Sequence, residues 1–136
     1  MRYGAGMTPL VIQRGIAAVF LILGGWCLFL PQSVLDLTVT PQFRSADPIV
    51  PILMAAFGAQ AVLAGLFAWT ARFTRTTFLV YGVALLPFFV FDYWAWAESM
   101  ITPLGLLDAL GNLVMLWLCY LGWKRTAPEP SRSIRP

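Results

Sequence analysis

The residues of this chain that could do chemistry are two acids and two amides within otherwise apolar stretches: Asp92, Asp108, Asn112 and Gln60. Asp92 precedes the end of one predicted helix and Asp108 follows the start of the next, each by about five residues, so both lie roughly 8 Å below one end of two antiparallel helices. Asn112 lies one turn beyond Asp108 on the same helix face. Gln60 lies roughly 18 Å from the start of its helix. We therefore expect the four side chains to line a cleft that opens outward and narrows inward.

Each of the two acids needs a proton, water or a cation, because an Asp at the centre of a membrane helix costs roughly 2.5–3.5 kcal/mol. No Lys, Arg or His lies in the hydrophobic interior of the predicted spans. Three outcomes are open: the acids are protonated, they face water, or Arg44 folds in from the preceding loop to pair with one of them. If the two carboxyl groups adjoin, they cannot both be charged without repulsion, and the pair is expected to hold a proton.

Two hypotheses explain these polar residues. They could form a pocket for a lipophilic or cationic ligand, or a proton-coupled site. Alternatively, Asp108 and Asn112 serve the first turn of their helix, Asp92 lies at the headgroup boundary beside Tyr or Trp, and Gln60 makes an interhelical hydrogen bond.

Other kinds of site are not supported by the sequence. The chain has no His and two Cys, and the predicted helices place Cys27 and Cys119 on the order of 15 Å apart in depth, beyond the reach of a disulfide. Zinc, copper and His-ligated haem sites are therefore not expected. There is no phosphate-binding loop, dinucleotide fingerprint or Ser-His-Asp set. We predict no metal, no cofactor and no catalytic residue.

The elements that must position these residues are four apolar helices. Of the 136 residues 60% are hydrophobic and 11% are charged, and the mean hydropathy is +0.77, too apolar for a soluble domain of this length. Apolar runs at about 14–30, 48–70, 76–97 and 103–123 are each long enough to cross a hydrocarbon core of ~30 Å. The predicted fold is an all-α integral membrane protein, an antiparallel four-helix bundle in one domain over 1–126, with a disordered tail at 127–136.

The positive charges predict how the bundle lies in the membrane. Short loops rich in Lys and Arg stay in the cytoplasm, and all such residues except Arg44 fall on one side of the four spans: Arg2, Arg14, Arg72, Arg75, Lys124, Arg125, Arg132 and Arg135. Both termini are therefore expected to be cytoplasmic, in a bacterial inner membrane. The net charge of +3 reflects this orientation and an attraction to anionic lipid, and it does not indicate nucleic-acid binding.

Two features of the helices bear on packing. The second run is rich in small residues, among them Gly58, Ala61 and Gly65, which let helix backbones approach closely in lipid. Pro87 interrupts the third run and predicts a kink, because proline cannot donate to the carbonyl of Val83.

The chain resembles the small DoxX-like four-helix proteins of bacterial inner membranes. The resembling layout covers most of the chain: a first helix that ends in Phe29-Leu30-Pro31, a long outer loop, a second helix with Phe57-Gly58-Ala59 and Ala64-Gly65-Leu66-Phe67, and a basic turn from Arg72 to Arg75. The resemblance implies a four-helix inner-membrane protein and assigns no biochemistry.

Three functions follow as hypotheses. The first is an accessory or structural subunit that packs with a larger membrane complex or with copies of itself, favoured by small size and by the small residues of the second helix. The second is a binding or transport protein that uses an outward-facing acidic cleft. The third is a membrane isomerase in which the acids transfer protons.

Overall fold

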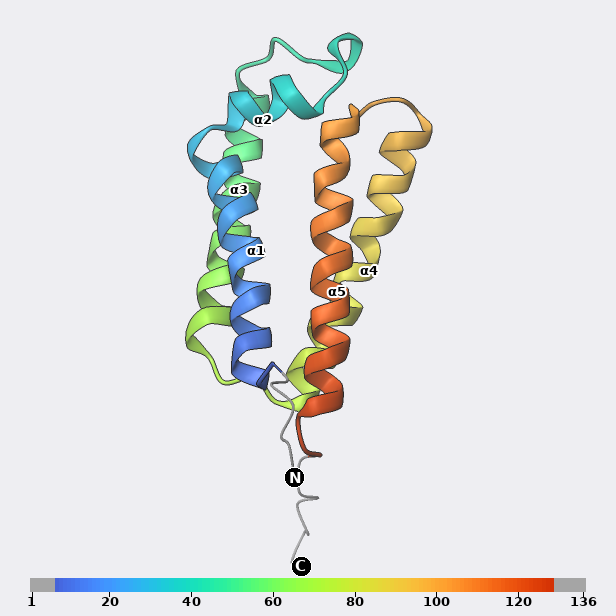
Figure 1. Ribbon diagram of the computed structural model, residues 1–136. Helices are drawn as coiled ribbons and strands as arrows, with labels where there is room; N and C mark the ends of the chain where they lie inside the picture. The colour runs from blue at the N-terminus through green and yellow to red at the C-terminus, as the bar shows by residue number, and fades with distance from the viewer. Residues whose placement is uncertain (1–6, 129–136) are drawn as a thin grey trace, which may run out of the picture.

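The computed structural model describes residues 7–128 and is built from helices (Figure 1). The long helices are α1 (Pro9–Phe29), α3 (Ile49–Thr70), α4 (Arg75–Ala97) and α5 (Leu107–Arg125), and the shorter elements are the helix α2 (Pro31–Thr38) and the 3-10 turns η1 (Pro41–Phe43) and η2 (Pro103–Leu106). Within residues 7–128 there is no strand, and one isolated bridge joins Val39 to Ile101. Arg2, Arg132, Arg135 and most of the predicted tail at 127–136 lie outside the described residues.

Four helical segments are long and apolar enough to cross a membrane, which confirms the predicted number of spans. Their surfaces are apolar as well: Ile22 is 70% exposed, Phe29 76% and Val90 65%. Soluble monomers rarely expose such a large continuous apolar surface to water. The chain therefore has the build of an integral membrane protein.

The first helix begins at Pro9, earlier than the expected start near Arg14. Thr8 accepts a hydrogen bond from the backbone N–H of Val11, and Pro9 occupies the first helical position, which is a favourable helix start. Arg14 consequently lies inside α1, where its guanidinium lies 5.2 Å from the centre of the Trp69 ring. The other spans begin and end close to their predicted bounds.

The segment between the first two predicted spans is not an irregular loop throughout, because it contains the helix α2 and the turn η1. Pro31 does end the first helix, but it also begins α2, which lies across one end of the molecule (Figure 1). The chain after α2 is joined to the α4–α5 turn, because Thr102 N donates to Thr38 O at 2.8 Å and Thr40 N donates to Met100 O at 2.9 Å. This connection closes that end of the molecule.

The small residues of α3 pack against α1, and this is the most extensive contact between helices. A Cβ built on Gly58 would lie 2.3 Å from the backbone nitrogen of Leu28, and one built on Gly24 would lie 2.7 Å from Cβ of Ala61. Gly65 faces the side chains of Phe20 and Leu21 in the same way. Close contact with α1 of the same chain therefore accounts for Gly58, Ala61 and Gly65 of this helix.

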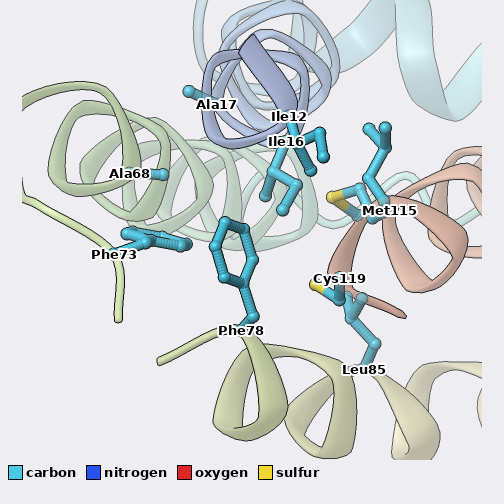
Figure 2. Packing of buried hydrophobic residues seen from close by; sticks show 10 residues of the cluster. Ile12, Ile16, Ala17, Ala68, Phe73, Phe78, Leu85, Met115 and Cys119 are labelled. Atoms are coloured by element: carbon cyan, nitrogen blue, oxygen red, sulfur yellow. The ribbon is translucent and has the colours of Figure 1, made fainter. Parts of the chain in front are cut away.

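The hydrophobic core lies toward the end of the molecule that carries the α3–α4 turn. Figure 2 shows Phe78 of α4 pointing toward Ile12 and Ile16 of α1. Phe73, in the turn, meets Phe78 edge to face with ring centres 5.2 Å apart. Met115 and Cys119 complete this cluster from α5. The opposite half has few buried residues, which leaves room there for cavities.

Candidate ligand cavity

Asn112 joins the two acids of the spans. Its amide nitrogen Nδ2 donates to Oδ2 of Asp108 at 3.0 Å and lies 3.4 Å from Oδ2 of Asp92. Asp108 is in the first turn of α5, Asn112 is one turn further along the same face, and Asp92 projects from α4, which packs along α5. Both hydrogens of the Asn112 amide are thereby used. The structure thus brings together three of the four predicted polar residues.

Arg44 does not approach these acids. Its Nε donates to the carbonyl oxygen of Val39 at 2.9 Å, and Nη2 donates to that of Asp36. These contacts satisfy carbonyl groups at the end of α2, which an arginine can do well because its guanidinium offers five donors. Of the three outcomes left open by the sequence, pairing of Arg44 with Asp92 or Asp108 is therefore the one that the geometry does not support.

The acids line a cavity of about 500 Å³ beneath α2. Trp26 and Cys27 of α1, Phe57 of α3, and Asp92 and Asp108 contribute to its walls. Most of the remaining lining is aliphatic. The two carboxyl groups are therefore the ionisable groups of a mostly apolar chamber at the capped end of the helices, called here the outer cavity.

A second cavity of about 390 Å³, the inner cavity, continues from Asp108 between the helices. Asp108 lines both cavities, whereas Asn112 lines the inner one. Gln60 of α3 and Tyr81 of α4 face the inner cavity together with apolar side chains of all four spans. The predicted cleft thus corresponds to two cavities that meet at one carboxyl group.

The inner cavity exists because α3 and α4 hardly touch, although they follow one another in the sequence. Contacts run from α3 to α1, from α1 to α5 and from α5 to α4, and those between α3 and α4 are few. Phe57 and Val80 line the cavity and remain 46% and 58% exposed. The inner cavity is therefore open between α3 and α4, toward the side that hydrocarbon would occupy.

Two polar groups of the inner cavity have unused hydrogen-bonding capacity. The amide of Gln60 and the hydroxyl of Tyr81 make no side-chain hydrogen bond to any residue in 7–128, while the Tyr81 ring packs on Phe73 at 4.8 Å and Phe20 at 6.3 Å. A polar group without a partner is costly at membrane depth. Within the described residues, Gln60 therefore does not form the interhelical hydrogen bond that was one hypothesis for its role.

Gln13 is a polar residue whose role the sequence did not reveal. Its amide nitrogen donates to the carbonyl oxygens of Ala68 and Ala71, and its carbonyl oxygen accepts from the backbone N–H of Phe73 at 3.1 Å. Gln13 is 3% exposed and holds the end of α3 and the following turn. The Thr8-Pro9 helix start was the available signal, because it places Gln13 inside α1 and not before it.

The arrangement offers acceptor oxygens from two acids, an amide acceptor, a phenolic hydroxyl and a long apolar wall. It suits a molecule with an apolar body and a donating or positively charged head. Among residues 7–128 there is no group of three His, Cys, Asp or Glu side chains that could hold a metal ion.

Comparisons with protein-family models, with curated proteins and with solved structures find no match to this chain.

Proposed function

We propose that this protein binds a small lipophilic molecule within the membrane through the cavities that meet at Asp108. The observation that carries the proposal is the position of Asp92, Asp108 and Asn112 on the wall of an apolar space. Cavities of about 390 and 500 Å³ lie within the roughly 300–1,000 Å³ range of small-molecule sites.

The chemistry of the lining defines the ligand. Both acids present acceptor oxygens and no residue of the described chain brings a cation to them, so the preferred head group is an ammonium or another strong donor. The apolar body of the ligand would extend past Asn112 into the inner cavity, where Gln60 and Tyr81 can hydrogen-bond a second polar group. Entry would be lateral, from the bilayer, between α3 and α4.

The proposal includes a definite arrangement in the membrane. The four spans form an antiparallel bundle in a bacterial inner membrane, with the α3–α4 turn and both termini in the cytoplasm and α2 on the outer face. The basic residues near the α3–α4 turn and near the end of α5 support this orientation. Pro87, inside α4, would kink that helix away from α3 and widen the inner cavity.

The accessory-subunit hypothesis has less support from the packing. It was favoured by the small residues of the second span, but Gly58, Ala61 and Gly65 contact α1 of the same chain. They are therefore not a free surface for a second helix. Binding within the bundle is the function that the geometry supports better.

The proposal predicts that removal of either acid weakens the binding of a lipophilic cation. The probes are decylammonium and its neutral analogue decanol, titrated calorimetrically into protein in lipid nanodiscs, with empty nanodiscs as the reference for partitioning. Asp108→Asn or Asp92→Asn should weaken decylammonium binding roughly tenfold to a hundredfold, because a charge-assisted hydrogen bond contributes about 1.5–3 kcal/mol. Decanol binding should change much less.

Glu98→Gln is the matched control. Glu98 is an exposed acid in the α4–α5 turn at the same end of the molecule, so this variant removes the same charge without touching a cavity. Its affinity for decylammonium should remain that of the unmodified protein. If Asp92→Asn and Asp108→Asn both bind decylammonium as tightly as the Glu98→Gln control does, the acids are not the binding site.

A further inference from the structure

Charge is divided unevenly between the two ends of the molecule. In the part of the chain that the structure describes, all acidic residues lie toward the end capped by α2: Asp36, Asp47, Asp92, Glu98 and Asp108. The opposite end, called here the basic end, carries Arg14, Arg72, Arg75, Lys124 and Arg125. Within residues 7–128, then, no carboxylate lies at the basic end to neutralise these cations.

An apolar groove of about 570 Å³ lies between α4 and α5 and extends to the basic end. Its walls carry aliphatic and aromatic side chains, and many of them are half exposed, for example Val83 at 57% and Trp117 at 54%. Gly82 deepens the groove because it has no side chain; a Cβ built there would lie 3.5 Å from Cβ of Cys119. The groove shares no lining residue with either of the cavities that meet at Asp108.

Two cations flank the groove where it reaches the basic end. The Arg75 guanidinium lies 4.3 Å from the centre of the Trp123 ring, and Nζ of Lys124 lies 4.9 Å from the centre of the Tyr120 ring. Both rings line the groove, and they stack with centres 6.5 Å apart. The Arg75 Nε is buried and has no hydrogen-bond partner among residues 7–128. The guanidinium is therefore held in place by an aromatic face and not by an anion.

We propose that this groove is a binding site for an anionic phospholipid of the leaflet at the basic end. An acyl chain would lie along the apolar floor between α4 and α5, and the phosphate would accept hydrogen bonds from Arg75 and Lys124. Arginine and lysine at the end of membrane helices attract anionic headgroups, and an aromatic pair at that depth suits the interface. The lipid supplies the negative charge that the described residues lack at this end.

Native mass spectrometry of the purified protein in detergent tests the site directly. The protein is incubated with equal amounts of phosphatidylglycerol and phosphatidylcholine that carry the same acyl chains. We expect preferential binding of phosphatidylglycerol. The double variant Arg75→Gln/Lys124→Gln should weaken phosphatidylglycerol binding roughly twenty-five-fold, about fivefold for each charge removed, and should leave phosphatidylcholine binding unchanged.

Arg14→Gln/Arg72→Gln is the matched control, because it removes two charges from the same end without touching the rings of the groove. Its phosphatidylglycerol binding should stay near that of the unmodified protein. Val83→Phe tests the groove itself: the added bulk on an exposed wall should weaken binding with no change in charge. Equal binding of both lipids by the unmodified protein overturns the proposal, even if a charge variant fails to fold. So does an equal loss in the two double variants, or unchanged phosphatidylglycerol binding in Val83→Phe.

Discussion

Gly58→Ala is expected to force α1 and α3 apart and to destabilise the protein more than any other single methyl group added to the spans. The new Cβ would lie 2.3 Å from the backbone nitrogen of Leu28 and 2.7 Å from the carbonyl oxygen of Gly24. Backbone atoms inside a helix cannot rotate away as a side chain can, so a whole segment of α1 must shift. Overpacking of this kind typically costs 1–3 kcal/mol, and we expect roughly 3 kcal/mol here.

Unfolding of the purified protein by sodium dodecyl sulfate in mixed micelles measures this effect. Gly25→Ala is the control, since it makes the same change on α1 where a Cβ would meet nothing within 4 Å. That variant should be as stable as the original or slightly more stable, because alanine favours a helix over glycine. Equal stability of Gly58→Ala and Gly25→Ala would show that the two helices do not approach as closely as described.

Gln13→Leu is expected to have an effect of similar size for a different reason. The leucine keeps most of the side-chain volume but removes the partners of three backbone groups: the carbonyls of Ala68 and Ala71 and the N–H of Phe73. A buried group that loses its partner costs roughly 1–3 kcal/mol, so the expected loss is about 3 kcal/mol. The loss of stability should be largest at the end of α3 and in the turn that follows it.

The same unfolding titration, combined with hydrogen exchange at the Phe73 amide, provides the measurement. Gln60→Leu is the control, because Gln60 also lies in a span but makes no side-chain hydrogen bond to the described residues. Stability should fall in the Gln13 variant and stay unchanged in the Gln60 variant, and Phe73 exchange should accelerate in the former alone. If the Gln13→Leu protein is as stable as the Gln60→Leu protein, Gln13 does not stabilise the turn.

The features that sequence predicted well are those set by local patterns. Length and hydropathy located four spans, and counting along helices of fixed rise placed Asp92 and Asp108 at one depth. The spacing of four residues put Asn112 beside Asp108. These inferences require no knowledge of which helices touch, and the structure brings the three side chains together accordingly.

The features that sequence could not predict depend on which helices pair. Small residues in α3 indicate close packing, but they do not say whether the partner is α1 or another molecule. The inner cavity results from the near absence of contact between α3 and α4, which no local pattern encodes. Pro31 lies just after the end of α1 and also begins α2, because a proline that cannot continue one helix suits the first position of another. Arg44 could pair with an acid of the spans on sequence grounds, but it donates to carbonyl groups at the end of α2.

Labelling of single cysteines with a membrane-impermeant maleimide in intact spheroplasts is the most direct test of the membrane arrangement on which both proposed sites depend. In a background in which Cys27 and Cys119 are replaced by alanine, each new cysteine is placed at an exposed position: Met7, Gln42, Arg72, Glu98 or Ala127. We predict labelling at Gln42→Cys and Glu98→Cys, and protection at Met7→Cys, Arg72→Cys and Ala127→Cys until the membrane is permeabilised. Labelling of Arg72→Cys from outside, or opposite results at Met7→Cys and Ala127→Cys, would contradict four spans with both ends in the cytoplasm.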